Sequence, residues 1–318
     1  MALASPISWL RIALRAASSS RTASRPGSQR VEMGLSFGPS DAFWPSWPLR
    51  AGTARDPIQS LMQPWIALWL CLGFFSQTLH TLTDAAAAET DLAAYAKRSF
   101  EEAQSRYQKA PGQTDTAWQF GRACFDLAEF ATNKTERASV AEQGMAACQQ
   151  AIARESNSAP AHYYLGMNLG QLARTRSLSA LKLVDQMEEE FSRARDLDDH
   201  LDCAGPDRNL GLLYADAPSI GSIGSRTQAR AHLKSAVKLA PEYPENRLNL
   251  IEAYLNWGER TGAHRELQAL EAAWPTARTN LVGDAWAASW ADWEPRLKKL
   301  KKKIEETPKA ISAPRGKN

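Results

Sequence analysis

Metal-binding motifs are absent from this sequence, although it contains residues from which they are built. Four cysteines and five histidines are scattered over 318 residues, and none stands in a Cys-x-x-Cys, His-x-x-x-His or His-Glu-x-x-His arrangement. Zinc needs ligands that converge, and known sites supply them at such short spacings. The acidic run 196–202 lacks the glycine and the terminal glutamate of a calcium loop. We therefore expect no metal and no cofactor.

Signatures of catalysis are missing as well. No Gly-x-Ser-x-Gly elbow occurs, and the Gly/Ser-rich loop 219–225 is not followed by the Gly-Lys-Ser/Thr of a phosphate-binding loop. No set of nucleophile, base and oxyanion donors can be read from the residues. This pattern predicts a protein that binds rather than an enzyme.

No apolar run is long enough to span a membrane as a helix, which takes about 20 residues. The run 65–75 has the length of a secretory signal core, and the small residues up to Ala88 supply an Ala-x-Ala cleavage pattern. We predict a signal peptide over 62–88, a disordered or misassigned leader over 1–61, and export to the periplasm. Two alternatives stay open: an uncleaved N-terminal segment that anchors the chain in a membrane, and an Arg- and Ser-rich transit peptide.

An excess of positive charge is confined to the leader. Residues 1–88 hold seven Arg, no Lys and four acids, whereas 89–318 hold 31 basic and 31 acidic residues. A neutral body offers no electrostatic footprint for a nucleic acid. We expect no nucleic-acid partner, and membrane contact only through an uncleaved leader.

Strand-like alternation is also lacking, and from residue 89 on the apolar residues recur at helical spacing. In 244–258, for example, Leu248 and Leu255 lie on one face and Gly258 suits the C-terminal end. Short polar loops separate such segments, 274–279 among them. A helical domain over 89–306 precedes a disordered tail over 307–318. Its expected helices are 91–109, 115–132, 136–154, 159–174, 178–197, 206–216, 225–239, 244–258, 262–273 and 284–306.

The helical pattern repeats along the chain. Residues 151–170 align without gaps with 236–255, and Leu210-Gly211 matches Leu165-Gly166. This resembles the tetratricopeptide repeat, a 34-residue pair of antiparallel helices. Three repeats carry extra residues, so the expected fold class is all-α: an irregular tetratricopeptide-like helical-hairpin solenoid of about four repeats. The last helix, in which tryptophans recur at helical spacing, is expected to cap it.

A closer resemblance covers roughly 116–260. The long divergent repeats, the predicted export and the loop region 214–241 look like the periplasmic T component of TRAP (tripartite ATP-independent periplasmic) transporters. That resemblance implies a ligand-sized apolar pore and a periplasmic protein partner such as a TRAP solute-binding protein. We predict a non-catalytic transport accessory that binds such a partner or a small apolar ligand. A generic protein–protein interaction scaffold built on the same repeats is the alternative.

The predicted binding surface is the groove formed by the first helix of each hairpin. A mostly apolar groove suits an apolar or mixed ligand, or an amphipathic peptide. The alternative is that several of its side chains are simply buried core. By the repeat register, its positions read Tyr163, Met167, Arg208, Leu212, Leu248, Glu252 and Leu255.

One pair of cysteines lies on the two helices of the first expected hairpin. Cys124 and Cys148 are about equally far from its turn, so a disulfide between them is expected in an oxidising periplasm. Cys203 would stay unpaired. The alternative is two small buried thiols that pack like alanine.

Overall fold

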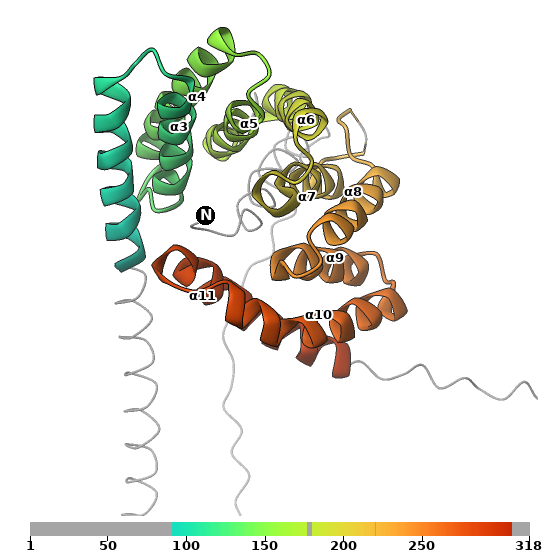
Figure 1. The fold of residues 1–318 in the computed structure, drawn as a ribbon. Helices are drawn as coiled ribbons and strands as arrows, with labels where there is room; N and C mark the ends of the chain where they lie inside the picture. The colour runs from blue at the N-terminus through green and yellow to red at the C-terminus, as the bar shows by residue number, and fades with distance from the viewer. Residues whose placement is uncertain (1–90, 177–179, 220, 307–318) are drawn as a thin grey trace, which may run out of the picture. The chain divides into compact units, whose positions relative to one another are not determined.

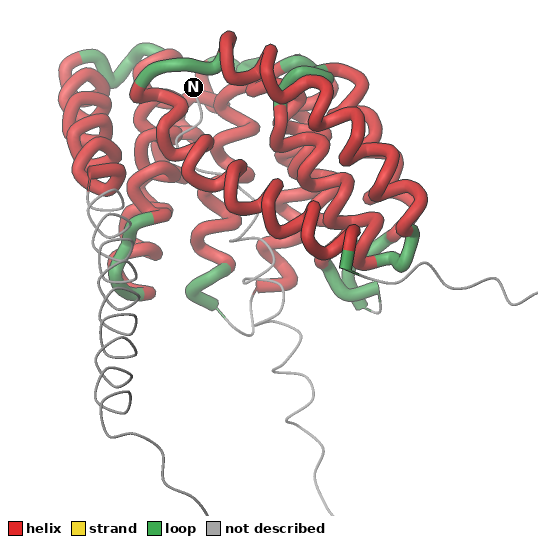
Figure 2. Tube along the Cα trace, turned by 90° about the horizontal axis from the view of Figure 1, so that it is seen from below, coloured by secondary structure: helices red, strands yellow, loops and turns green. Residues whose placement is uncertain are grey.

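A computed structural model describes residues 91–176, 180–219 and 221–306 of the chain. The predicted leader 1–61, signal peptide 62–88 and tail 307–318 lie outside these residues. Within them, every regular element is helical (Figures 1 and 2). The all-α prediction is therefore confirmed.

The described helices follow one another with short connections. The first covers 91–109. It is followed by α3 (Thr114–Glu129), α4 (Lys134–Arg154), α5 (Ala159–Ala173), α6 (Ala180–Leu197), α7 (Leu201–Asp216), α8 (Arg226–Leu239), α9 (Pro244–Asn256), α10 (Arg260–Asn280), the short 3-10 helix η1 (Asp284–Trp286) and α11 (Ala287–Glu305).

Local chemistry explains where the helices begin and end. At the start of α4, the Asn133 side chain accepts a hydrogen bond from the Glu136 backbone N–H at 2.9 Å, and the Glu136 carboxylate accepts one from the Thr132 N–H at 2.9 Å. This reciprocal capping satisfies donors that a helix start leaves free. After α9, Gly258 takes a left-handed conformation with φ +76°, which glycine adopts without steric cost.

The predicted loop 274–279 is wrong, because α10 continues through it to Asn280. Pro275 removes only one backbone donor from the ladder. Thr279 then donates its hydroxyl to the Pro275 carbonyl at 3.1 Å, and Ala277 is buried at 1% exposure. Packing of this last part of the helix thus outweighs the local helix-breaking signal.

Consecutive helices pack in pairs, α3 with α4, α5 with α6, α7 with α8 and α9 with α10. The first helices of neighbouring pairs also contact each other, from α3 through α5, α7 and α9 to α11, so they form one layer of the stack (Figure 1). This is the predicted irregular helical-hairpin solenoid. Its last helix, α11, packs on α9 and α10. The buried Trp293 of α11 contacts Tyr243 edge-on, with the ring centroids 5.2 Å apart.

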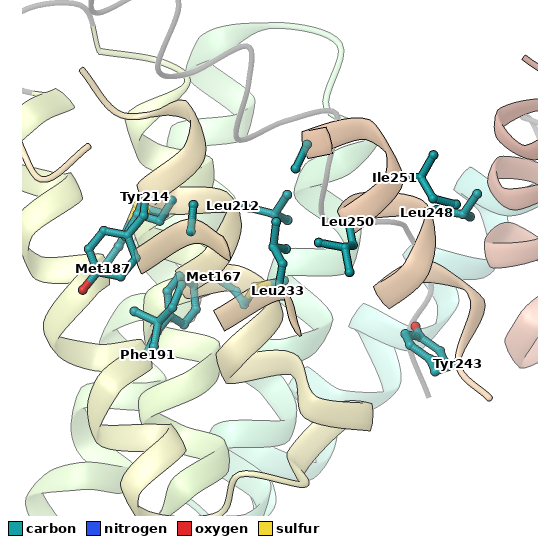
Figure 3. Packing of buried hydrophobic residues seen from close by; sticks show 14 of the residues in the cluster. Met167, Met187, Phe191, Leu212, Tyr214, Leu233, Tyr243, Leu248, Leu250 and Ile251 are labelled. Carbon is teal, nitrogen blue, oxygen red and sulfur yellow. The ribbon is translucent and has the colours of Figure 1, made fainter. Parts of the chain in front are cut away.

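Close approach within the pairs depends on glycine. A Cβ on Gly166 would lie 2.6 Å from the Phe191 ring of α6, and one on Gly211 would lie 2.7 Å from Leu233 of α8. Both partner side chains are fully buried in the main apolar core (Figure 3). The glycines that identified the repeat are therefore the points where its two helices touch.

In the part of the chain that the structure describes, no helix combines the length and the apolar character needed to cross a membrane.

Candidate functional site

The predicted groove does not form an accessible binding surface over its whole length. Tyr163, Arg208 and Leu248 have no exposed surface, and Met167 and Leu212 are exposed by only 2% and 1%. Leu255 is half-buried against the core, and Glu252 pairs with Arg296 at 3.1 Å. The five buried residues lie on α5, α7 and α9, and they pack in the interior. Figure 3 shows Met167, Leu212 and Leu248 within the apolar cluster.

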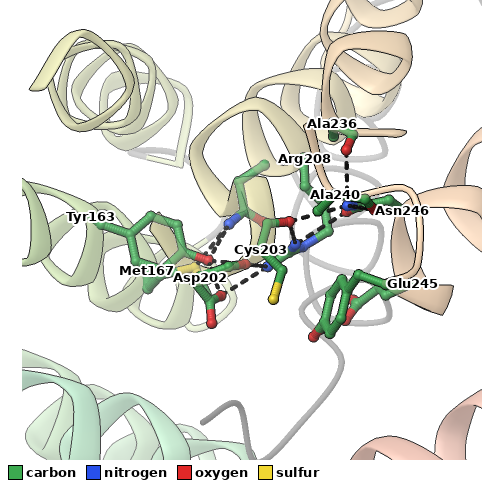
Figure 4. A network of polar contacts seen from close by, with 11 residues as sticks. Tyr163, Met167, Asp202, Cys203, Arg208, Ala236, Ala240, Glu245 and Asn246 are labelled. Atoms are coloured by element: carbon green, nitrogen blue, oxygen red, sulfur yellow. Dashed lines mark hydrogen bonds and ion pairs between the residues drawn. The ribbon is translucent and has the colours of Figure 1, made fainter. Parts of the chain in front are cut away.

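Arg208 of α7 occupies the centre of this interior as the hub of a polar network (Figure 4). One guanidinium nitrogen donates to the Cys203 carbonyl and to Asn246 Oδ1, both at 3.1 Å. The other donates to Asp202, at 2.8 Å to its carboxylate and 3.1 Å to its carbonyl. Tyr163 of α5 donates its hydroxyl to the same carboxylate at 2.8 Å. The network therefore joins α5, α7 and α9.

Electrostatics keep this buried arginine charged. Burial works against the charge, but the nearby acids Glu245 and Asp202 contribute to raising the pKa of Arg208 well above its usual value. The guanidinium also lies 5.1 Å from the centre of the Tyr243 ring, a favourable cation–π position. A buried charge that is paired in this way is costly to unpair.

The network holds an unusual backbone turn at the start of α7. Asp202, Cys203 and Ala204 have φ values of 50°, 54° and 62°, so three successive residues without glycine are left-handed. Each costs roughly 1–2 kcal/mol. Because Arg208 bonds both the Asp202 and the Cys203 carbonyls, it offsets part of this cost. The network is thus a structural lock.

The repeat register extends to α3, where no groove positions were predicted. Phe120-Gly121 corresponds to Leu165-Gly166, and Gly121 packs on α4 as Gly166 packs on α6. The groove positions of α5, Tyr163 and Met167, stand three residues before and one residue after Gly166. The same offsets from Gly121 give Trp118 and Arg122, and Asp126 follows one turn after Arg122. This signal was present in the sequence, and it identifies the groove positions that stay accessible.

These positions line a cleft of about 250 Å³, named here the α3 cleft. Its walls come from the helix over 91–109, from α3 and from η1, so segments far apart in the sequence meet there. The lining residues are Tyr95, Ser99, Ala103 and Arg106 of the first helix, Trp118, Gln119, Arg122, Ala123 and Asp126 of α3, and Ala285.

Both aromatic and charged side chains line the α3 cleft. The Trp118 ring stacks on Tyr164 with centroids 5.9 Å apart, and it is oriented by a 3.0 Å hydrogen bond from its N–H to Asp115. The Arg122 guanidinium lies 5.9 Å from the same Tyr164 ring and 3.8 Å from the Asp126 carboxylate. Arg106 is exposed.

Asp126 is the one acidic side chain in the described lining, and it is exposed by only 4%. Desolvation raises its pKa to about 7, against the opposing effect of the Arg122 charge. The carboxyl is therefore partly protonated near neutral pH. The cleft consequently presents two guanidinium groups and less than one full negative charge.

Two further clefts lie outside the predicted groove. One, of about 340 Å³, is lined mostly by apolar groups of the α8–α9 turn and the end of α10, Tyr243 and Leu281 among them. The other, of about 450 Å³, runs along α11 beside Trp274 and several lysines. Sequence periodicity gave no sign of either, because both form where separate hairpins meet.

The predicted Cys124–Cys148 disulfide is not present, since both cysteines are free buried thiols. Each lies against a glycine of the opposite helix: a Cβ on Gly121 would collide with Cys148 Sγ, and one on Gly144 would lie 2.7 Å from Cys124 Cβ. Burial raises the pKa of both thiols. They pack as small apolar residues and stay protonated. Cys203 is also a free thiol.

In the described ranges no three His, Cys, Asp or Glu side chains are grouped so that they would hold a metal ion. His162 instead contacts Glu190 at 2.6 Å, and His232 contacts Asp207 at 2.6 Å. Both histidines thus tie neighbouring helices together.

Comparison with known proteins gives two findings. The family model described as regulator of microtubule dynamics protein 1-3 matches residues 80–202, which is less than half of the chain. The crystal structure of a thermophilic TPR (tetratricopeptide-repeat) protein from Thermus thermophilus is similar at 17% sequence identity and a TM-score of 0.46, over 68% of this chain and 93% of that one. No curated protein matches.

Proposed function

We propose that this chain is a non-catalytic protein-binding scaffold whose α3 cleft holds a peptide segment of a partner. The observation that carries the proposal is the cleft itself. It opens at the inward-facing register positions of α3, whereas the same positions of α5, α7 and α9 are largely buried. Helical repeats commonly bind partners on the face formed by their first helices. At about 250 Å³ the recess is small, which suits a few side chains of a peptide.

The groups in the cleft support binding rather than chemistry. Arg122 and Asp126 neutralise each other in part, Trp118 and Tyr95 offer flat apolar surface, and Ser99 and Gln119 offer hydrogen bonds. Aromatic anchors beside arginine are typical of the residues that dominate protein interfaces. The described cleft lining holds no cysteine or histidine that would serve as nucleophile or base.

A role in regulating microtubule dynamics is consistent with such a scaffold, because the matching family model bears that name and the regulation of a polymer by a non-catalytic protein requires protein contacts. The finer prediction from sequence, a periplasmic accessory of a TRAP transporter, is a second candidate. The apolar 340 Å³ cleft beside Tyr243 favours it, since the small apolar ligand of that prediction would fit there.

Export itself is tested by N-terminal sequencing of the mature protein, which should begin at or near Glu89. Recovery of the protein from the cytosol alone would exclude export.

The scaffold proposal is tested by selecting a random displayed peptide library on the full-length chain. Ser99→Trp places a bulky ring in the cleft from a partly buried position, so it should abolish the enrichment. Gln108→Trp adds the same ring at an exposed site of the same helix outside the cleft and should leave enrichment intact. Equal enrichment on both variants would place the binding surface elsewhere, and no enrichment on the wild type would contradict the scaffold.

A further inference from the structure

The charges that line the α3 cleft are unequal. Arg106 and Arg122 contribute two guanidinium groups from two different helices, and Asp126 contributes the one carboxyl of the described lining. Arginine stays protonated at every physiological pH. Even with Asp126 fully ionised, the lining carries a net positive charge, although residues 89–318 together are neutral.

The two guanidinium groups also have unused hydrogen-bond donors. The Arg106 side chain is exposed and has no hydrogen-bond or ion-pair partner among the described residues. Arg122 approaches Asp126 only to 3.8 Å, which is beyond hydrogen-bond distance. Each guanidinium presents five N–H donors in a fork that matches a carboxylate. An anion entering the cleft therefore meets free donors rather than a closed ion pair.

Flat aromatic surface lies beside these charges. Trp118 is held by its stacking on Tyr164 and by its bond to Asp115, so it is ordered before any ligand arrives. Tyr95 lines the same cleft from the helix over 91–109. A side chain with an apolar body next to a carboxylate would use both features.

We propose that the α3 cleft binds an acidic peptide segment, with carboxylates paired to Arg122 and Arg106 and an apolar neighbour packed on Trp118. This inference rests on the proposed scaffold function and specifies the partner's chemistry. A protein segment is favoured over a membrane because the Arg122 side chain is only 23% exposed within a recess, which a flat headgroup surface does not enter. A nucleic acid needs an extended basic surface, and these two arginines line a single small recess.

The first test is the composition of the peptides selected on the full-length chain. The proposal expects Asp and Glu to be enriched next to aromatic or aliphatic residues. Enrichment of neutral or basic peptides that Ser99→Trp abolishes would overturn the acidic inference and leave the scaffold intact. Failure to enrich any peptide would contradict the scaffold itself, so the two failures are distinguishable.

The second test measures the Kd of one selected acidic peptide by fluorescence anisotropy. Arg122→Gln should weaken binding about tenfold, because hydrogen bonds to charged groups are lost. Asp126→Asn should strengthen it severalfold, because Asp126 competes with the peptide for Arg122. Lys97→Gln removes a charge from an exposed site of the first helix outside the cleft and should change little. Changes of the same sign in Arg122→Gln and Asp126→Asn would overturn the proposal.

Arg106→Gln separates an effect on peptide binding from an effect on folding. Arg106 is exposed, and its side chain is unpaired within the described part of the chain, so its replacement should weaken peptide binding severalfold and leave the Tm unchanged. Unchanged affinity in this variant would remove Arg106 from the site and overturn the two-guanidinium arrangement. Binding to phosphatidylserine vesicles that is lost in both arginine variants, without binding to acidic peptides, would assign the cleft to a lipid instead.

Discussion

At the scale of single residues, the layer formed by the first helices of the pairs carries two kinds of polar group. Some stabilise the fold from the interior, and others face a cleft. Arg208 has no exposed surface and bonds the carbonyls of a left-handed turn. Arg122, on the same layer, is partly exposed, lies 5.9 Å from the centre of the Tyr164 ring and approaches the Asp126 carboxylate only to 3.8 Å. Sequence reasoning assigned Arg208 to the groove from its register position in the repeat. It could not show that neighbouring helices enclose the side chain.

The first prediction at this scale concerns Arg208. Arg208→Met removes the hub and leaves the partly buried Asp202 and the fully buried Asn246 without their bonds to the guanidinium, so the free energy of unfolding should fall by about 3–5 kcal/mol. Urea denaturation followed by circular dichroism measures this change. Arg195→Met serves as the control, since Arg195 pairs at the surface with Asp196 and should cost less than about 1 kcal/mol. Equal effects of the two changes would contradict the lock.

The second prediction concerns Asp126 and pH. Its pKa rises from an ordinary value of 3.8 to about 7 on folding, mainly through desolvation. Between these values the folded state binds more protons than the unfolded state, so the free energy of unfolding should fall as the pH rises from about 4 to about 7. One pKa unit corresponds to about 1.4 kcal/mol, and the fall should amount to a few kcal/mol.

Asp126→Asn provides the comparison for this pH dependence. The variant should lose that part of the slope and should be more stable than the wild type at pH 8. Denaturation at a series of pH values on both proteins checks it. If the free energy of unfolding changed by the same amount between pH 4 and pH 7 in the wild type and in Asp126→Asn, the assignment would be contradicted.

At the scale of helices, periodicity predicted type and order, and packing decided the ends. The start of α4 is marked by its capping residue Asn133, and the starts of α5 and α9 are marked by a proline in the first turn; the sequence displays all three signals. The extension of α10 beyond Pro275 was not predictable from local signals, because it depends on contacts such as the burial of Ala277. The α3 cleft likewise depends on tertiary packing. The repeat register in the sequence identifies its α3 positions, but whether these positions are accessible depends on where η1 and the helix over 91–109 lie.

Pro275 itself gives a prediction at this scale. It is exposed inside α10, and Pro275→Ala restores a backbone donor to the carbonyl of Glu271. The free energy of unfolding should rise by about 1–3 kcal/mol, as measured by urea denaturation. Thr276→Ala, at the next exposed position, should change it by less than about 1 kcal/mol. A loss of stability in Pro275→Ala would mean that the proline shapes a bend which the packing of α10 requires.

At the scale of the whole helical unit, stability should be distributed along the stack, because each hairpin contacts mainly its neighbours. The apolar core is nevertheless continuous from Phe125 near the start to Leu300 in α11. The terminal helix therefore protects the last hairpin directly and the first one only indirectly. This arrangement predicts that loss of the cap loosens the stack from one end.

Trp293→Ala tests that end-to-end order. Trp293 is fully buried and contacts Tyr243, Trp286 and Trp290, so its truncation should cost about 3–5 kcal/mol locally. Amide hydrogen exchange should accelerate first in α9, α10 and α11, while α3 and α4 keep most of their protection. Val282→Ala, at a side chain that is 64% exposed, should leave the exchange pattern unchanged. Uniform acceleration across all helices would instead show that the unit unfolds as a single cooperative block, and peptide binding at α3 would then be lost together with the cap.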